Sequence, residues 1–172
     1  MKKPTILFLF IFIAVGFGAN AQKIIDAESI VNFSLENRGS EVNGTLGGMK
    51  GDVIFDKENL GKSSFDVTID ANTINTNNRK RDAHLKNEDF FETETYATIS
   101  FASSKIEKKK DKYVATGTLS MHGISKDVAI IFSVTEKEER QHLQGSFVLD
   151  HADYGIGKTR DVSITITCVV SK

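Results

Sequence analysis

The chain has 172 residues, of which 22 are Lys or Arg and 23 are Asp or Glu, so its formal net charge is -1 at pH 7. This balance excludes the strongly basic surface that nucleic-acid-binding proteins use. The single cysteine, Cys168, excludes a framework of intramolecular disulfides. A chain of this length is typical of one domain.

The first 21 residues are predicted to be a secretory signal peptide. Two lysines precede an apolar run from Ile6 to Val15, and Ala19 and Ala21 have the spacing of a cleavage site. The run is too short to remain as a membrane-spanning helix, and no second long apolar run follows, so we expect no stable membrane insertion. Cleavage near Ala21 would leave residues 22–172 as one domain that is periplasmic or secreted.

Beyond this leader, apolar and polar residues alternate with a period of two, which predicts half-buried antiparallel strands. The alternating segments are 31–35, 53–55, 65–69, 99–101, 113–121, 128–134, 143–149 and 162–170. With a glycine-broken segment near 42–46, we count about eight strands, enough for an antiparallel sheet to close on itself. We therefore expect an all-β fold, an eight-stranded antiparallel barrel. A two-sheet sandwich is the alternative, because strand number does not separate the two.

One segment breaks the alternation. Residues 77–88 place Arg81, Leu85 and Glu88 at helical spacing, which predicts one short helix between two strands. Two adjacent phenylalanines, Phe90 and Phe91, follow it. Two large rings at this position are expected to plug one end of the barrel or to line its entrance.

The barrel interior is predicted to be apolar and rich in phenylalanine. Such an interior either packs into a solid core or leaves room for one ligand. An empty lumen of about 300 Å³ would cost on the order of 7 kcal/mol, so the space should be packed or occupied by something apolar. The residues expected to line a ligand site are Phe33, Phe55, Phe65, Val67, Phe101, Leu119, Phe132, Phe147 and Ile166, with Phe90 and Phe91 at the entrance.

Arg81, Asp82 and His84 are the residues with which chemistry could be done. No serine or cysteine nucleophile stands in a recognisable motif, so we expect no catalytic residues and no enzyme activity. The structural interpretation is that Arg81 and Asp82 pair and cap the helix, while His84 satisfies a buried backbone group. The functional alternative places Arg81 and His84 at the barrel mouth, where they would contact the polar head of a ligand.

Neither a metal nor another cofactor is expected. The four histidines, His84, His122, His142 and His151, lie in four separate segments, and the sequence contains no H-x-H or C-x-x-C pair. Cys168 falls on the inward face of the last strand, where a thiol behaves as a small apolar residue.

Five stretches together resemble the YceI family of exported lipid-binding proteins. They are GDVIFD (51–56), ANTINTNNRKRDAHLKNEDFF (71–91), YATISFASSKI (96–106), YVATGTLSMHGISKDVAI (113–130) and DHADYGIG (150–157). The third stretch has Ala97 where the family commonly has proline, and the last has His151 where arginine is common. The resemblance covers about 150 residues in register.

This resemblance implies a lipocalin-like barrel whose tunnel holds a polyisoprenoid or fatty-acid-like lipid without a catalytic step, and it suggests a homodimer. We therefore expect a carrier of a long-chain amphiphile. The tail would set the affinity, at about 0.8 kcal/mol per methylene, and the mouth would set the identity of the ligand. The alternative is a ligand-free exported interaction or stress-response domain with a packed core. A weaker alternative is a hydrolase that uses His84.

Overall fold

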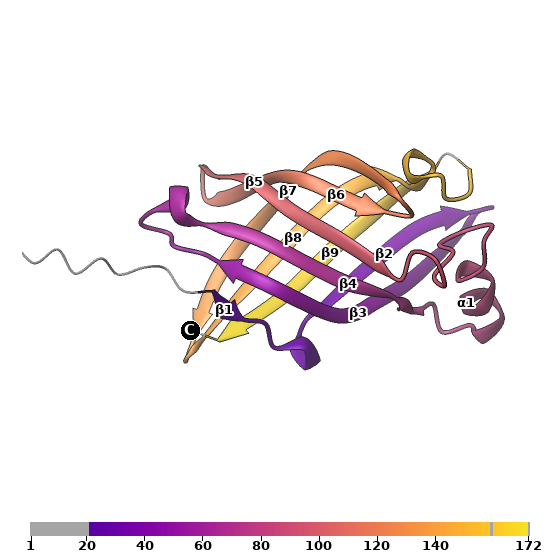
Figure 1. Cartoon of the computed structure of the whole chain (residues 1–172), viewed down its shortest axis with the longest axis horizontal. Helices are drawn as coiled ribbons and strands as arrows, with labels where there is room; N and C mark the ends of the chain where they lie inside the picture. Colours follow the sequence, from indigo (N-terminus) through magenta and orange to yellow (C-terminus); the bar gives the residue numbers. More distant parts are fainter. Residues whose placement is uncertain (1–20, 159, 172) are drawn as a thin grey trace, which may run out of the picture.

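Long antiparallel strands form the wall of a barrel in the computed structural model, which describes residues 21–158 and 160–171 (Figure 1). Residues 1–20, with most of the predicted signal peptide, lie outside the described residues. The strands are β1 (Gln22–Lys23), β2 (Ile30–Asn37), β3 (Ser40–Ile54), β4 (Ser64–Asn75), β5 (Thr98–Lys109), β6 (Lys112–Met121), β7 (Ile124–Lys137), β8 (Arg140–Asp150) and β9 (Asp161–Ser171). The helices are α1 (Arg79–Leu85) and the single 3₁₀ turns η1 (Asp26–Glu28), η2 (Leu60–Lys62) and η3 (His151–Tyr154).

The sheet closes on itself. Its strand order is β3-β2-β9-β8-β7-β6-β5-β4, and β4 pairs back with β3 to complete the ring, while the short β1 adds to β3. Every pairing is antiparallel, and the most extensive runs from Arg140 opposite Ser171 to Asp150 opposite Asp161. The predicted eight-stranded antiparallel barrel is therefore confirmed, and the sandwich alternative is wrong.

The seam between β3 and β4 corrects one sequence prediction. The segments 42–46 and 53–55, expected as separate strands, belong to the single strand β3, whose register shifts between Thr45 and Lys50. Gly51 has a φ of +119°, and a Cβ built there would lie 2.1 Å from the carbonyl oxygen of Asp66 on β4. The glycines thus allow a close approach of two backbones within one continuous strand.

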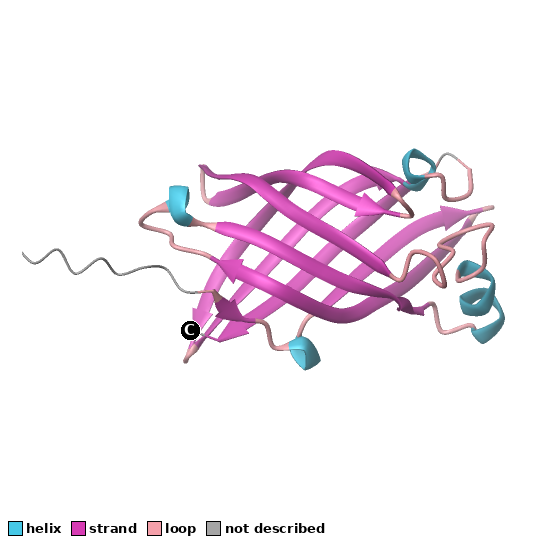
Figure 2. Cartoon of the chain, in the orientation of Figure 1, coloured by secondary structure: helices cyan, strands magenta, loops and turns pink. Residues whose placement is uncertain are grey.

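The predicted helix is present but shorter than expected. The Asn78 side chain accepts a hydrogen bond from the Arg81 amide at 3.1 Å and caps the start of α1. The helix ends at Leu85, whose carbonyl accepts a bond from Phe91 N at 3.0 Å, so Glu88 lies in the turn beyond it. Figure 2 shows α1 at one end of the barrel, between β4 and β5. None of the described helices is both long and apolar enough to span a bilayer.

The two ends of the barrel differ in construction. We call the end that carries α1, η3 and the β2–β3 and β6–β7 turns the helix end (Figure 1). We call the opposite end, with β1, η2 and the β5–β6 turn, the closed end. The Gln22 side chain lies at the closed end, where its amide nitrogen donates to Gln141 Oε1 at 2.9 Å and its oxygen accepts from Phe55 N at 3.2 Å. The terminal strand therefore helps to cover this end.

Candidate ligand-binding site

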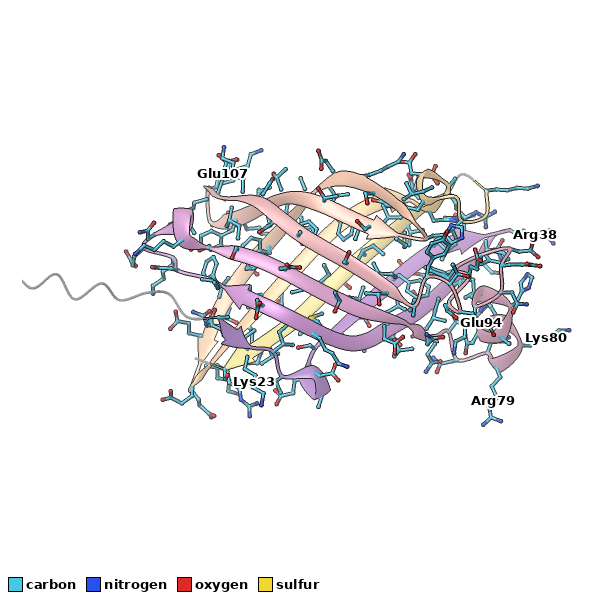
Figure 3. The ribbon with its side chains drawn as sticks, in the orientation of Figure 1. Lys23, Arg38, Arg79, Lys80, Glu94 and Glu107 are labelled. Carbon is cyan, nitrogen blue, oxygen red and sulfur yellow. The ribbon has the colours of Figure 1, made fainter. Side chains whose placement is uncertain are left out.

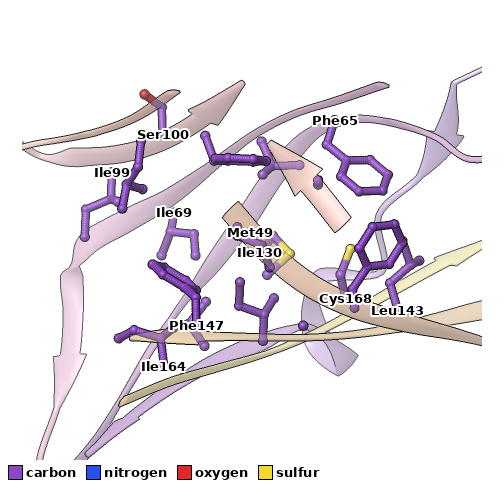
Figure 4. A pocket seen from close by; sticks show the side chains of 18 of the residues that line it. Met49, Phe65, Ile69, Ile99, Ser100, Ile130, Leu143, Phe147, Ile164 and Cys168 are labelled. Carbon is purple, nitrogen blue, oxygen red and sulfur yellow. The ribbon is translucent and has the colours of Figure 1, made fainter. Parts of the chain in front are cut away.

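The middle of the barrel contains an apolar cavity of about 150 Å³, here called the inner cavity. Side chains from β4, β7, β8 and β9 point toward the same space in Figure 4, including Ile69, Ile130, Phe147 and Ile164. Of the described residues that line it, only Ser100 carries a hydroxyl group. Predicted lining residues found here are Phe65, Val67, Phe101, Leu119, Phe132, Phe147 and Ile166.

A second cavity of about 530 Å³, the outer cavity, extends from the inner cavity toward the helix end. Leu46, Met121, Leu149 and Ile164 line both cavities, so the two spaces adjoin along the barrel. The outer cavity alone lies within the range of about 300–1,000 Å³ that is usual for small-molecule sites. Together they form a long apolar space that reaches from α1 into the barrel interior.

Aromatic rings fill the barrel beyond the inner cavity. Phe55 packs edge-on against Tyr113 and Phe132, with ring centroids 5.0 and 5.8 Å apart, and Phe65 packs against Phe132 at 5.3 Å. Tyr113 stacks on Phe132 at 5.4 Å. Phe55 was predicted to line the ligand site, but it lies in this cluster and lines neither cavity. The cavity is therefore blocked at the closed end.

Phe33 lines the outer cavity because a glycine faces it across the sheet. Phe33 on β2 pairs with Gly44 on β3, and a Cβ built on Gly44 would lie 2.2 Å from the tip of the Phe33 ring. The far end of the ring therefore occupies the space that a side chain at position 44 would need. Gly44, the central residue of the glycine-broken segment 42–46, thus makes room for a cavity wall.

The segment after α1 covers the outer cavity. Phe90, Phe91, Leu85 and His84 all line it, and the His84 and Phe90 rings meet edge-on at 4.8 Å. His84 is exposed, so the prediction that it satisfies a buried backbone group is wrong. Phe90 and Phe91 lie where the sequence placed them, at one mouth of the barrel.

Two other histidines serve buried backbone groups at the helix end. The Nδ1 atom of His122 is 2.9 Å from the carbonyl oxygen of Tyr154, and His151 Nδ1 contacts the carbonyl oxygen of Ile156. Because a carbonyl only accepts, Nδ1 is the donor in both contacts. His151 also lines the outer cavity.

Arg81 and Asp82 meet through Thr76, which lies buried between β4 and α1. Asp82 Oδ1 accepts hydrogen bonds from the hydroxyl and the amide of Thr76, at 2.5 and 2.8 Å. Arg81 donates from Nε to the Thr76 hydroxyl at 2.8 Å and from Nη2 to its carbonyl at 2.9 Å. The Thr76 hydroxyl, more than the charge of Arg81, lowers the pKa of Asp82. The prediction that Arg81 and Asp82 cap the helix is therefore wrong. Both side chains anchor α1 to Thr76, and Asn78 caps the helix.

The outer cavity also has polar lining residues that sequence reasoning missed. Lys158 and Arg160, in the loop between η3 and β9, line it together with Asn37 at the end of β2. Arg160 donates from Nη1 to Asn37 Oδ1 at 2.6 Å and to the Glu36 carbonyl at 3.1 Å. Their position in an aperiodic loop gave no signal in the hydropathy pattern.

Cys168 lines the inner cavity and is buried, as predicted. Burial raises the pKa of its thiol to about 11, so the group is protonated at neutral pH. Within residues 21–158 and 160–171, no three His, Cys, Asp or Glu side chains converge as a metal site requires.

Residues 23–171 match the sequence profile of the YceI-like domain. The chain belongs to the YceI family. A UPF0312 protein of Vibrio campbellii is 34% identical over 128 residues, which span 71% of the YceI-family chain described here and 68% of that protein. The predicted family is thus confirmed.

Two solved structures share this fold. BcnA of Burkholderia cenocepacia superposes with a TM-score of 0.80 at 21% identity, covering 85% of this YceI-family chain and 98% of BcnA. A polyisoprenoid binding domain from Saccharophagus degradans, implicated in plant cell wall breakdown, superposes with a TM-score of 0.68 at 16% identity, covering 88% and 98% of the two chains.

Proposed function

We propose that this YceI-family protein binds the apolar tail of a long-chain amphiphile, such as a polyisoprenoid or a fatty-acid-like lipid, inside its barrel. The observation that carries the proposal is the continuous apolar space formed by the two cavities, lined by ten of the eleven residues predicted to hold a ligand. The relationship of the fold to a polyisoprenoid binding domain supports the same class of ligand.

The size of the inner cavity also favours an occupant. At about 24 cal/mol per Å³, an empty space of 150 Å³ costs about 4 kcal/mol, a large part of the stability of a typical domain. A tail in this space replaces lost contacts with new ones, and every methylene buried adds about 0.8 kcal/mol. An apolar chain therefore stabilises the barrel by filling it.

The proposed role is binding without chemistry. His84, the residue on which a hydrolase would depend, is exposed and lies against Phe90 at the mouth. The YceI-like profile and the polyisoprenoid binding domain both support a binding protein in place of an enzyme. We further propose that the protein acts after export and is cleaved near Ala21. The intact mass of the mature product should then equal that of a chain beginning at Gln22. The suggested homodimer stays a prediction that light scattering can test.

Native mass spectrometry of the exported protein tests the binding proposal. We expect one lipid mass to accompany the protein and to be removed by solvent extraction, after which added amphiphile rebinds. A ligand-free mass together with no uptake would support the alternative, an interaction or stress-response domain without a ligand.

A pair of matched substitutions locates the bound tail. Ala115 on β6 is buried and lines the inner cavity. Ala129, on the neighbouring strand β7, is exposed on the outside of the barrel. Ala115→Leu should displace about two to three methylenes of a long tail, at about 0.8 kcal/mol each, and weaken its binding at least tenfold. Ala129→Leu adds the same atoms outside and should leave affinity unchanged. Equal effects would place the tail elsewhere.

A further inference from the structure

The mouth of the outer cavity carries an excess of positive charge. Three cationic side chains, Arg81, Lys158 and Arg160, line this cavity, and Asp89 is the only acidic residue among its described lining residues. A site for an apolar tail needs no cation, and charges beside an apolar space lose solvation. The excess therefore calls for a role in addition to tail binding.

The two arginines are held in place by uncharged acceptors. Arg81 donates to the hydroxyl and carbonyl of Thr76, and Arg160 donates to the Asn37 side chain and the Glu36 carbonyl. A guanidinium has five N–H groups, so each arginine keeps donors beyond those used in these bonds. Neither takes part in the ion pairs found among the described residues. Their charge is therefore positioned but not neutralised by contact.

Three acidic groups near the mouth are engaged elsewhere. Asp82, next to Arg81, is bound to Thr76 and does not line the cavity. Asp150 accepts hydrogen bonds from the amides of Ala152 and Arg160, both at 2.9 Å, and Asp153 pairs with Lys126 at 2.7 Å. These carboxylates stabilise the loops and leave the cations of the mouth facing the cavity.

We propose that the helix end of the outer cavity binds an anionic head group, a phosphate or a carboxylate, between Arg81, Lys158 and Arg160. This inference rests on the proposed function, because the head group belongs to an amphiphile whose tail occupies the barrel. Guanidinium groups bind phosphate and carboxylate through paired N–H donors, and partial burial at the mouth strengthens the attraction. The ligand is then an anionic amphiphile in preference to a neutral alcohol, amide or quinone.

Ligands with one tail and different heads test this assignment. Geranylgeranyl monophosphate and geranylgeraniol form one pair, and hexadecanoic acid and hexadecanol form another. Each competes with the neutral probe N-phenyl-1-naphthylamine for the delipidated mature protein. We expect the anionic member of at least one pair to bind at least tenfold more tightly at low salt, with a smaller difference at high salt. The pair with the larger difference identifies phosphate or carboxylate as the preferred head.

Variants that remove one positive charge distinguish a local head-group site from the general electrostatic field of the protein. Arg160→Gln and Lys158→Gln should each reduce the anion-to-alcohol preference several-fold, and an unchanged β-sheet signal in circular dichroism reports that the barrel is intact. Lys80→Gln is the matched control, because Lys80 is an exposed cation on α1 that projects away from the barrel and does not line the cavity (Figure 3). Retention of the preference in Lys80→Gln supports a local site.

Different results would overturn the head-group assignment and the proposed function. Equal binding of alcohol and anion to the unmodified protein would overturn the head-group assignment alone. An equal loss of preference in Lys80→Gln and Arg160→Gln would also overturn it, since a diffuse field would then explain the result. If neither member of either pair displaces the probe, the proposed function fails together with this inference.

Discussion

Phe55, directly after β3, and Phe147, on β8, both point into the barrel, yet they meet different surroundings. Phe55 is buried and contacts the rings of Tyr113 and Phe132 at the closed end. Phe147 on β8 is partly buried and lines the inner cavity, so part of its ring faces open space. The same residue type therefore serves as packing in one place and as a cavity wall in the other.

This difference predicts unequal losses of stability. Phe55→Ala should lower the free energy of unfolding by about 3–5 kcal/mol, because its neighbours lose contacts on every side and a new cavity forms. Phe147→Ala in the delipidated protein should cost clearly less, since it only enlarges a space that already exists. Urea denaturation of both variants measures the two losses. Equal losses would mean that the inner cavity is not open in solution.

At the scale of elements, α1 is anchored to the end of β4 by a titratable group. The carboxylate of Asp82 holds the buried Thr76, and the hydrogen bonds from Thr76 keep the pKa of Asp82 below its ordinary value of 3.8. A carboxylate with a lowered pKa stabilises the folded state above its unfolded pKa, and this contribution is lost as pH falls through the folded pKa. The anchor should therefore weaken only in acid.

We expect amide protection factors in α1 to fall when pH is lowered from 6 to 3, with the barrel strands less affected. Hydrogen exchange, corrected for the intrinsic pH dependence of exchange, measures this change. Asp82→Asn should show low protection in α1 at both pH values, because an amide replaces the ionised acceptor. Asp89→Asn, on the same segment but away from Thr76, is the control and should behave like the unmodified protein. A pH response that persists in Asp82→Asn would exclude Asp82 as its source.

The elements were predictable where one physical rule acts alone. In a barrel with an apolar interior, the period of two is enforced along every strand, and it identified seven of the long strands separately. It divided β3, because the glycines between 46 and 53 interrupt the alternation while they serve the seam with β4. It missed Lys158 and Arg160, because loop residues follow no period. In an up-and-down barrel, however, alternate loops meet at one end, and this parity groups the η3–β9 loop with α1.

Contacts of single polar residues were beyond the reach of the sequence. Arg81 and Asp82 were expected to pair, but both bind Thr76, which β4 brings beside the helix. His84 was expected to bind backbone, but His122 and His151 do so. These choices depend on which acceptor lies nearby in space, and spacing along the chain does not determine it.

For the whole molecule, closure of the sheet separates the role of the scaffold from the role of a ligand. Because β4 pairs with β3, the backbone hydrogen bonds of the long strands are made within the barrel, and the described strands leave no long edge open. A lipid tail adds apolar contacts inside the wall and no backbone pairing. Removal of a ligand should therefore lower stability without unfolding the chain.

We expect solvent extraction to lower the melting temperature while the β-sheet signal in circular dichroism is retained. A ligand at about 100 times its Kd stabilises a protein by about 2.7 kcal/mol, which is roughly 5–10 °C for a domain of this size. Differential scanning calorimetry of loaded, extracted and reloaded protein measures the shift. Ala129→Leu should show the full shift and Ala115→Leu a smaller one, because only the latter reduces the inner cavity. Identical melting temperatures before and after extraction would favour a barrel whose stability does not depend on a ligand.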